Sequence, residues 1–166
     1  MASHTGSVKV VVTSALSNAL DIGTPSHSFN KTFTNAFANG TSANQANQSF
    51  ADTRTLASNT AENLDLAGAL TDGLGATITF TSIKAIIISA AAANTTALTI
   101  GAGTNPLLGL FADGSDAIVI QPGGTFAITN PAANGYAVTA STGDILKVSN
   151  ATGASATYDV IIFGEV

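Results

Sequence analysis

The chain of 166 residues contains no cysteine and no tryptophan, and charged residues make up only 9% of it. Without cysteine there are no disulfides, no thiolate metal site and no cysteine nucleophile. A typical soluble domain has about 25% charged residues, and surface charge helps to keep such a domain in solution. The scarcity of charge therefore suggests that other subunits cover much of the surface. The alternative is a neutral monomer.

Basic residues are especially few. Five lysines and arginines against ten acids give a net charge of −5. They stand singly along the chain, at Lys9, Lys31, Arg54, Lys84 and Lys147. A nucleic-acid partner requires a patch of basic side chains that neutralises phosphates, so we expect no contact with DNA or RNA.

No apolar run is long enough for a membrane helix. The most apolar stretch, "AIIISAAAA" at 85–93, falls short of the ~20 residues that such a helix needs, so we expect no membrane partner. The N-terminal "MASHTGSVKVVV" lacks the basic start of a signal peptide. We interpret it as a strand, in a protein that stays in the cell that makes it.

Alternating apolar and polar residues dominate what the chain does contain. In the last such stretch, Tyr158, Val160 and Ile162 fall on one face of a strand. The best helix candidate, "TSALSNAL", is short and rich in Ser and Asn. Many short strands separated by Gly, Pro and Asn turns predict an all-β fold, a sandwich or a closed barrel. The predicted strands lie near 7–13, 28–36, 50–57, 62–67, 76–81, 83–90, 96–101, 117–121, 125–129, 136–140, 144–149 and 156–163.

Two turns predict hairpins between neighbouring strands. "QPGG" at 121–124 separates "AIVI" from "TFAIT", and its two glycines are available for positive φ. "ANG" at 133–135 precedes "YAVTA", and its Asn-Gly pair is the strongest short hairpin signal in the chain.

Residues 24–50 are rich in Asn, Ser, Thr and Gln, with too little apolar content for a core of their own. The segment carries four spaced phenylalanines, Phe29, Phe33, Phe37 and Phe50. It is either an extended arm that these residues pin to a partner or an edge strand with a long loop. We divide the chain into an N-terminal strand and extended arm, 1–50, and a sandwich body, 51–166.

The connection at 101–116, "GAGTNPLLGLFADGSD", is apolar in its middle, although loops normally expose polar residues. Its apolar side chains therefore need a partner, which is either the end of the chain's own sandwich or a neighbouring subunit. We predict that seven side chains lie at a subunit contact, three in the arm and four in this connection: Phe29, Phe33, Phe37, Leu107, Leu108, Leu110 and Phe111.

Residues suited to catalysis are few. His4 and His27 have no carboxylate at a recognisable spacing, and no GxSxG elbow or GxGxxG loop occurs. Asp113 and Asp116 in "DGSD" suit either a calcium ion or, as we favour, a turn. We therefore predict no catalytic residue, no metal, no cofactor and no enzymatic activity.

A carbohydrate-binding module is the natural rival among β-sandwiches, because such modules stack sugars on aromatic side chains. The chain offers no tryptophan and only two tyrosines, Tyr136 and Tyr158. This scarcity weakens the lectin interpretation.

Several stretches resemble small virion proteins of tailed bacteriophages. They are "GTPSHSF", "ANGTSANQANQSFADTRTLASNTAENLDLAGALTDGLGATITFTSIKAI", "PGGTFAITNPAANGYAVTASTGDILKVSN" and "YDVIIFG", and together they span the chain from about residue 20 to its end. Proteins of this kind include all-β capsid decoration, or cement, proteins, some of them jelly rolls. The resemblance brings no catalytic motif with it.

This resemblance implies a jelly-roll-like β-sandwich on the head surface of a virion, made in the cytoplasm of the bacterial host. The implied partners are the major capsid protein and further copies of the chain, with a trimer favoured around a symmetry axis. A tail or fibre component, in contact with the host surface, is the alternative. A low-charge protein with no reactive site suits such a structural role.

Overall fold

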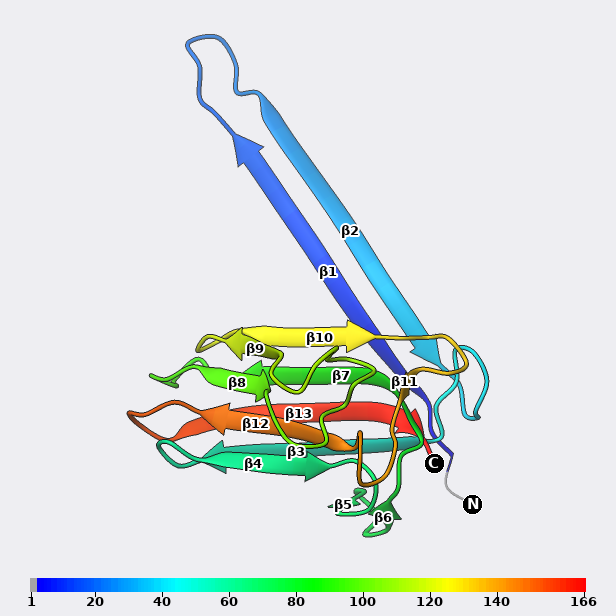
Figure 1. Cartoon of the computed structure of the whole chain (residues 1–166). Coiled ribbons are helices and arrows are strands. Elements are labelled where there is room, and N and C mark those ends of the chain that lie inside the picture. The colour runs from blue at the N-terminus through cyan, green and yellow to red at the C-terminus, as the bar shows by residue number, and fades with distance from the viewer. Residues whose placement is uncertain (1–2) are drawn as a thin grey trace.

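The computed structural model describes residues 3–166, and every regular element in that range is a β-strand. Two antiparallel sheets pack together as a body, and a two-stranded ribbon projects from it (Figure 1). The predicted all-β sandwich is therefore confirmed, while a jelly-roll order of strands stays a prediction. Nowhere in residues 3–166 is there a helix long and apolar enough to cross a membrane.

The first sheet of the body has a central pair of strands with one strand on either side. Its order is β10 (Thr125–Thr129), β7 (Ser82–Ala90), β13 (Ala156–Glu165) and β3 (Gln48–Leu56). The short β11 (Tyr136–Ala137) pairs with β7 beyond the end of β10. The run of β-branched residues in β7 fits this central place, because such side chains pack well on a buried pleated surface.

The second sheet covers one face of the first (Figure 1). Its order is β4 (Ala61–Asp65), β12 (Ile145–Asn150), β8 (Leu98–Gly101) and β9 (Ala117–Ile120). A small separate hairpin joins β5 (Leu70–Thr71) to β6 (Thr77–Ile78).

The core lies between these two sheets. The alternating residues Tyr158, Val160 and Ile162 of β13 all point into it and are buried, as their spacing predicted. From the second sheet, Leu146 and Val148 on β12 meet them with the same period of two. Burying such a side chain stabilises the fold by about 1.5–3 kcal/mol, so this layer is the main source of stability.

Both predicted hairpins are wrong, although both turns exist. The "QPGG" turn carries the chain from β9 in one sheet to β10 in the other, so the strands that flank it do not pair. The Asn134-Gly135 turn joins β10 to β11, which both pair with β7. The residues of a tight turn determine that the chain reverses there, but they do not determine with which strand the following segment pairs.

The projecting ribbon consists of β1 (Gly6–Ser17) and β2 (Ser26–Phe37), and we call residues 6–37 the arm. The two strands pair along all twelve residues of each, from Gly6↔Phe37 to Ser17↔Ser26. At about 3.3 Å per residue the arm is about 40 Å long, and it extends well beyond the body (Figure 1). From Gln48 onward, the segment that we expected to be arm belongs to β3 of the body.

Candidate interaction surface

The root of the arm packs on the outer face of the first sheet. Phe37 is 2% exposed and lies with Val8 against Ala85, Ile87 and Phe163, in a small core separate from the main one. These contacts fix where the arm leaves the body.

Close packing around the Phe163 ring strengthens this root. A Cβ atom on Gly6 would lie 2.8 Å from a carbon of that ring, so any other residue there would push the ring out of its place. The His4 ring meets the same phenylalanine edge-on, with centroids 4.9 Å apart. Further along the arm, Asn35 Nδ2 donates a hydrogen bond of 2.6 Å to Thr129 Oγ1 of β10.

Beyond its root, the arm has two chemically different faces. Because residue i of β1 faces residue 43 − i of β2, even-numbered residues of β1 share a face with odd-numbered residues of β2. We call one side the apolar face of the arm; its members are Val10, Val12, Leu16, Phe29 and Phe33. The opposite face carries mainly Ser, Thr and Asn, with Lys9 and Val11 among them.

All five side chains of the apolar face are exposed, Phe33 by 57% and Leu16 by 71%. One charged residue lies among them, Lys31, whose Nζ is 5.9 Å from the centroid of the Phe33 ring. The face therefore combines a row of apolar side chains with a single ammonium group.

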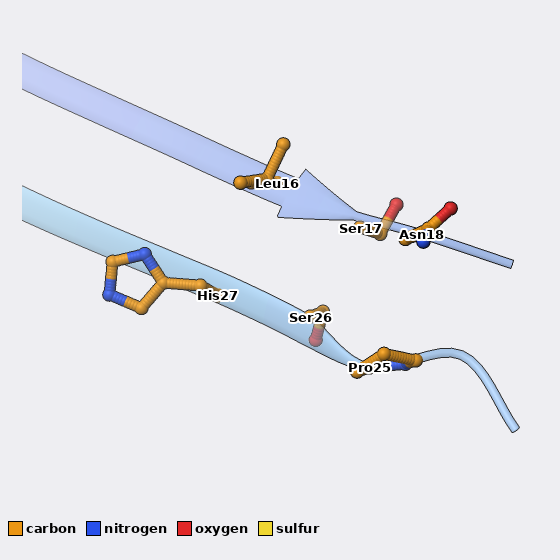
Figure 2. A pocket seen from close by; sticks show the side chains of 6 residues that line it. All are labelled: Leu16, Ser17, Asn18, Pro25, Ser26 and His27. Atoms are coloured by element: carbon orange, nitrogen blue, oxygen red, sulfur yellow. The ribbon is translucent and has the colours of Figure 1, made fainter. Parts of the chain in front are cut away.

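A shallow groove lies at the tip of the arm. Figure 2 shows that it is formed where both strands end, with Leu16 on β1 opposite His27 on β2. Ser17, Asn18, Pro25 and Ser26 complete its lining. Its open shape and lack of charged groups suit contact with another surface more than enclosure of a small molecule.

The structure divides the seven predicted contact residues between interior and surface. Phe29, Phe33 and Leu108 are exposed and available to a partner. Phe37 is buried in the root of the arm, Leu107 and Phe111 are buried in the main core, and Leu110 packs partly against that core. The expectation is therefore corrected for Phe37, Leu107 and Phe111, since the chain itself already covers them, whereas for the half-buried Leu110 it stays a prediction. The apolar middle of residues 101–116 closes one end of the sandwich.

Sequence reasoning missed a buried ion pair. Lys84 is fully buried, and its Nζ lies 2.8 Å from Glu165 Oε1. The same ammonium donates to the backbone oxygens of Ala132 and Ala133, each at 2.6 Å, and Ser82 Oγ donates to Glu165 Oε2. The signal in the sequence was a lysine inside an otherwise apolar strand, but its partners lie far along the chain.

The remaining candidate groups serve local structure. Asp113 accepts hydrogen bonds from the amide and hydroxyl of Ser115, and these bonds lower the pKa of its carboxyl. Asp116 accepts from the amide of Asp113, closing the same turn. Burial lowers the pKa of His4, which lies at the arm root, whereas His27 lies near the arm tip. Among residues 3–166, no three His, Cys, Asp or Glu side chains gather as metal ligands would.

Comparison of the chain with known protein families, with curated proteins and with solved structures finds no match. The arm carries most of the exposed large apolar side chains of residues 3–166 and is therefore the candidate interaction surface.

Proposed function

We propose that this protein is a structural component of a phage virion, a capsid decoration protein that binds the outer shell and stabilises the head as a homo-oligomer. The observation that carries the proposal is the arm. A well-packed body holds out a preformed ribbon about 40 Å long, most of whose large apolar side chains have no partner within the chain.

Such an arm suits assembly on a large surface. When a flexible segment becomes ordered on a partner, the conformational entropy that it loses costs about 1–2 kcal/mol per residue. The arm is already paired along twelve residues of each strand, so less ordering is left for the moment of binding. Its length also lets it reach past its own body to a neighbouring subunit or to the shell.

The body suits the same role for a different reason. Its core is continuous between two sheets, and its buried ion pair ties the end of β13 to the loop after β10. Arg54 and Glu62 likewise form an ion pair of 2.8 Å that links β3 to β4, one strand of each sheet. These ion pairs join strands of the body to one another, and a rigid body suits a structural protein.

Electron microscopy tests the proposal. Purified protein is added to phage shells that lack it, and the decorated shells are imaged beside intact particles. Density repeated over the icosahedral shell is the expected result. Density only along the tail axis of intact particles would instead favour a tail or fibre component, and density on neither would contradict a virion role.

A further inference from the structure

We propose that the apolar face of the arm packs against the same face of the arm in further copies of this chain. The inference rests on the proposed assembly role and specifies the partner of this one surface. The occupant is another arm, not the body of a neighbour and not the shell.

The uncovered apolar surface is concentrated on the arm. Eight of the thirteen large apolar side chains that are exposed in residues 3–166 lie between residues 10 and 33. Monomeric soluble proteins seldom display contiguous apolar patches of this kind without a partner. The five members of the apolar face lie on one side of both strands, from Val10 and Phe33 nearer the root to Leu16 nearer the tip. A partner that covers them must be long, flat and apolar.

The body of a second copy offers no surface of that description within the described residues. Its exposed large apolar side chains are scattered among separate elements: Leu74, Leu108, Val119, Ile161 and Val166. The arm root covers the outer sheet face around Ala85, Ile87 and Phe163. What remains open is a short hollow beside Ile161, whose lining includes Asp52, Thr53 and Asp159 as well as Ala51. Next to Ile161 that face becomes polar, where Thr53 donates a hydrogen bond of 2.6 Å to Asp159.

The arm root shows how this face makes contacts. Val8 and Phe37 continue the same row toward the body, and they pack flat against the side chains of a β-sheet. Sheet faces pack at about 10 Å from one another, with their side chains interdigitated. A second arm presents a sheet face of equal length and width, carrying the same Val, Leu and Phe side chains, so the surface is complementary to itself.

The area of the face indicates how many arms are needed. A ribbon about 40 Å long and about 10 Å wide offers about 400 Å². Two arms would bury about 800 Å² in total, whereas stable interfaces bury about 1,200–2,000 Å². A closed set of three arms buries about 1,200 Å² summed over its three contacts and turns every apolar face toward a common axis, so we infer a set of three.

Lys31 is compatible with this arrangement. It is exposed and is the only residue with a formal charge on this side of the paired strands. A lysine stem can lie along apolar surface while its ammonium group stays in water at the rim. Three such groups then remain solvated at the edge of the contact.

Matched variants of the full chain test the inference by sedimentation in solution without any shell. Val10→Thr with Val12→Thr alters the apolar face and keeps β-branched side chains. Val11→Thr is the control, because Val11 is 51% exposed, close to the 44% of Val10, but lies on the opposite face. We expect the wild type to sediment with a mass above the 16.4 kDa of one chain. The association constant of the double variant should be lower by about tenfold or more, and that of the control should equal the wild-type value.

A cross-linking experiment identifies the contact itself. Because the chain has no cysteine, Ser14→Cys places a single thiol on the side of the apolar face, and Thr13→Cys places one on the other side. Mild oxidation should give disulfide-linked dimers only with Ser14→Cys. Equal cross-linking of both variants, or a wild type that stays monomeric at all micromolar concentrations, would overturn the inference.

Binding to undecorated shells separates this inference from the proposed function. A monomeric wild type that binds shells through Val10 and Val12 leaves the decoration role standing and refutes the arm-to-arm contact. A trimer that depends on Val10 and Val12 but never binds shells would support the arm-to-arm contact and refute the decoration role.

Discussion

The hydroxyl of Tyr158 on β13 donates a hydrogen bond of 2.7 Å to Glu62 Oε1 on β4, across the space between the two sheets. The other oxygen of Glu62 lies 2.8 Å from Arg54 Nη1 on β3. Arg54 also pairs with Asp52 at 3.1 Å, the surface ion pair that alternation along this strand predicts. One tyrosine in the core thus connects both sheets to a chain of charges at the sheet edge.

Replacing this tyrosine should weaken the sandwich without changing its fold. Tyr158→Phe removes the hydroxyl and leaves Glu62 with one partner fewer. A hydrogen bond to a charged group contributes about 1.5–3 kcal/mol, so we expect the free energy of unfolding to fall by about that amount. Thermal melting measures it. Tyr136→Phe is the control, since no hydrogen bond of that hydroxyl occurs within residues 3–166; an equal loss in both variants would contradict the role of the Glu62 contact.

Alkaline pH gives a second test of the same side chain. Burial, together with the Glu62 carboxylate, raises the pKa of Tyr158 far above its value of about 10 in an unfolded chain. Above about pH 10 the unfolded state loses this proton while the native state keeps it, so stability falls as pH rises. The difference in stability between wild type and Tyr158→Phe should therefore narrow above about pH 10. A constant difference in urea melts across that range would refute the assignment.

The strands themselves could be predicted, because a period of two is a local property. Tyr158, Val160 and Ile162 show it, and all three are buried. The partners of each strand could not be predicted, since pairing joins residues far apart in the sequence. The pattern predicts strands at both 7–13 and 28–36, yet nothing local indicates that they pair with each other outside the body.

The contact residues of the candidate surface could be predicted only in part, because their spacing is a local property whereas their burial depends on distant parts of the chain. Phe29, Phe33 and Phe37 recur every four residues, which places them on one face of a strand. Their different fates depend on distance from the body, which the spacing does not reveal: Phe37 reaches the outer sheet face and the other two do not. Leu107 and Leu108 differ likewise, because a turn directs one into the core and the next into solvent.

The buried ion pair should be costly to break from one side. Lys84→Met leaves Glu165 and two backbone oxygens without their donor, and removing one partner of a buried pair costs about 3–5 kcal/mol. Adding Glu165→Gln to Lys84→Met should recover part of the loss, because no unpaired charge then remains buried. Urea denaturation measures both variants. A double variant as unstable as the single one would show that the oxygens of Ala132 and Ala133 matter more than the charge.

Neighbouring leucines in residues 101–116 should respond in opposite ways. Leu107 is fully buried, so Leu107→Ala should cost about 2–5 kcal/mol through the cavity that it leaves. Leu108 is 53% exposed, so Leu108→Ala should change stability by no more than about 0.5 kcal/mol. Chemical denaturation compares the two under one condition. A large loss of stability from Leu108→Ala would mean that this side chain, too, supports the sandwich.

Shortening the arm should separate folding from assembly. Replacing residues 12–31 by a two-residue Asn-Gly turn keeps Gly6–Val11 paired with Thr32–Phe37, and with them the root contacts of Val8 and Phe37. Since the removed residues are exposed, we expect the stability of the body to change by about 1 kcal/mol or less in thermal melts. Replacing only residues 18–25 by the same turn is the control, because it retains the whole apolar face. We expect self-association to disappear in the first variant, and shell binding to weaken with it because single copies lose the avidity of a set of three. Both should persist in the control. Failure of the first variant to fold would mean that the outer arm contributes to the stability of the body, which its exposed side chains argue against.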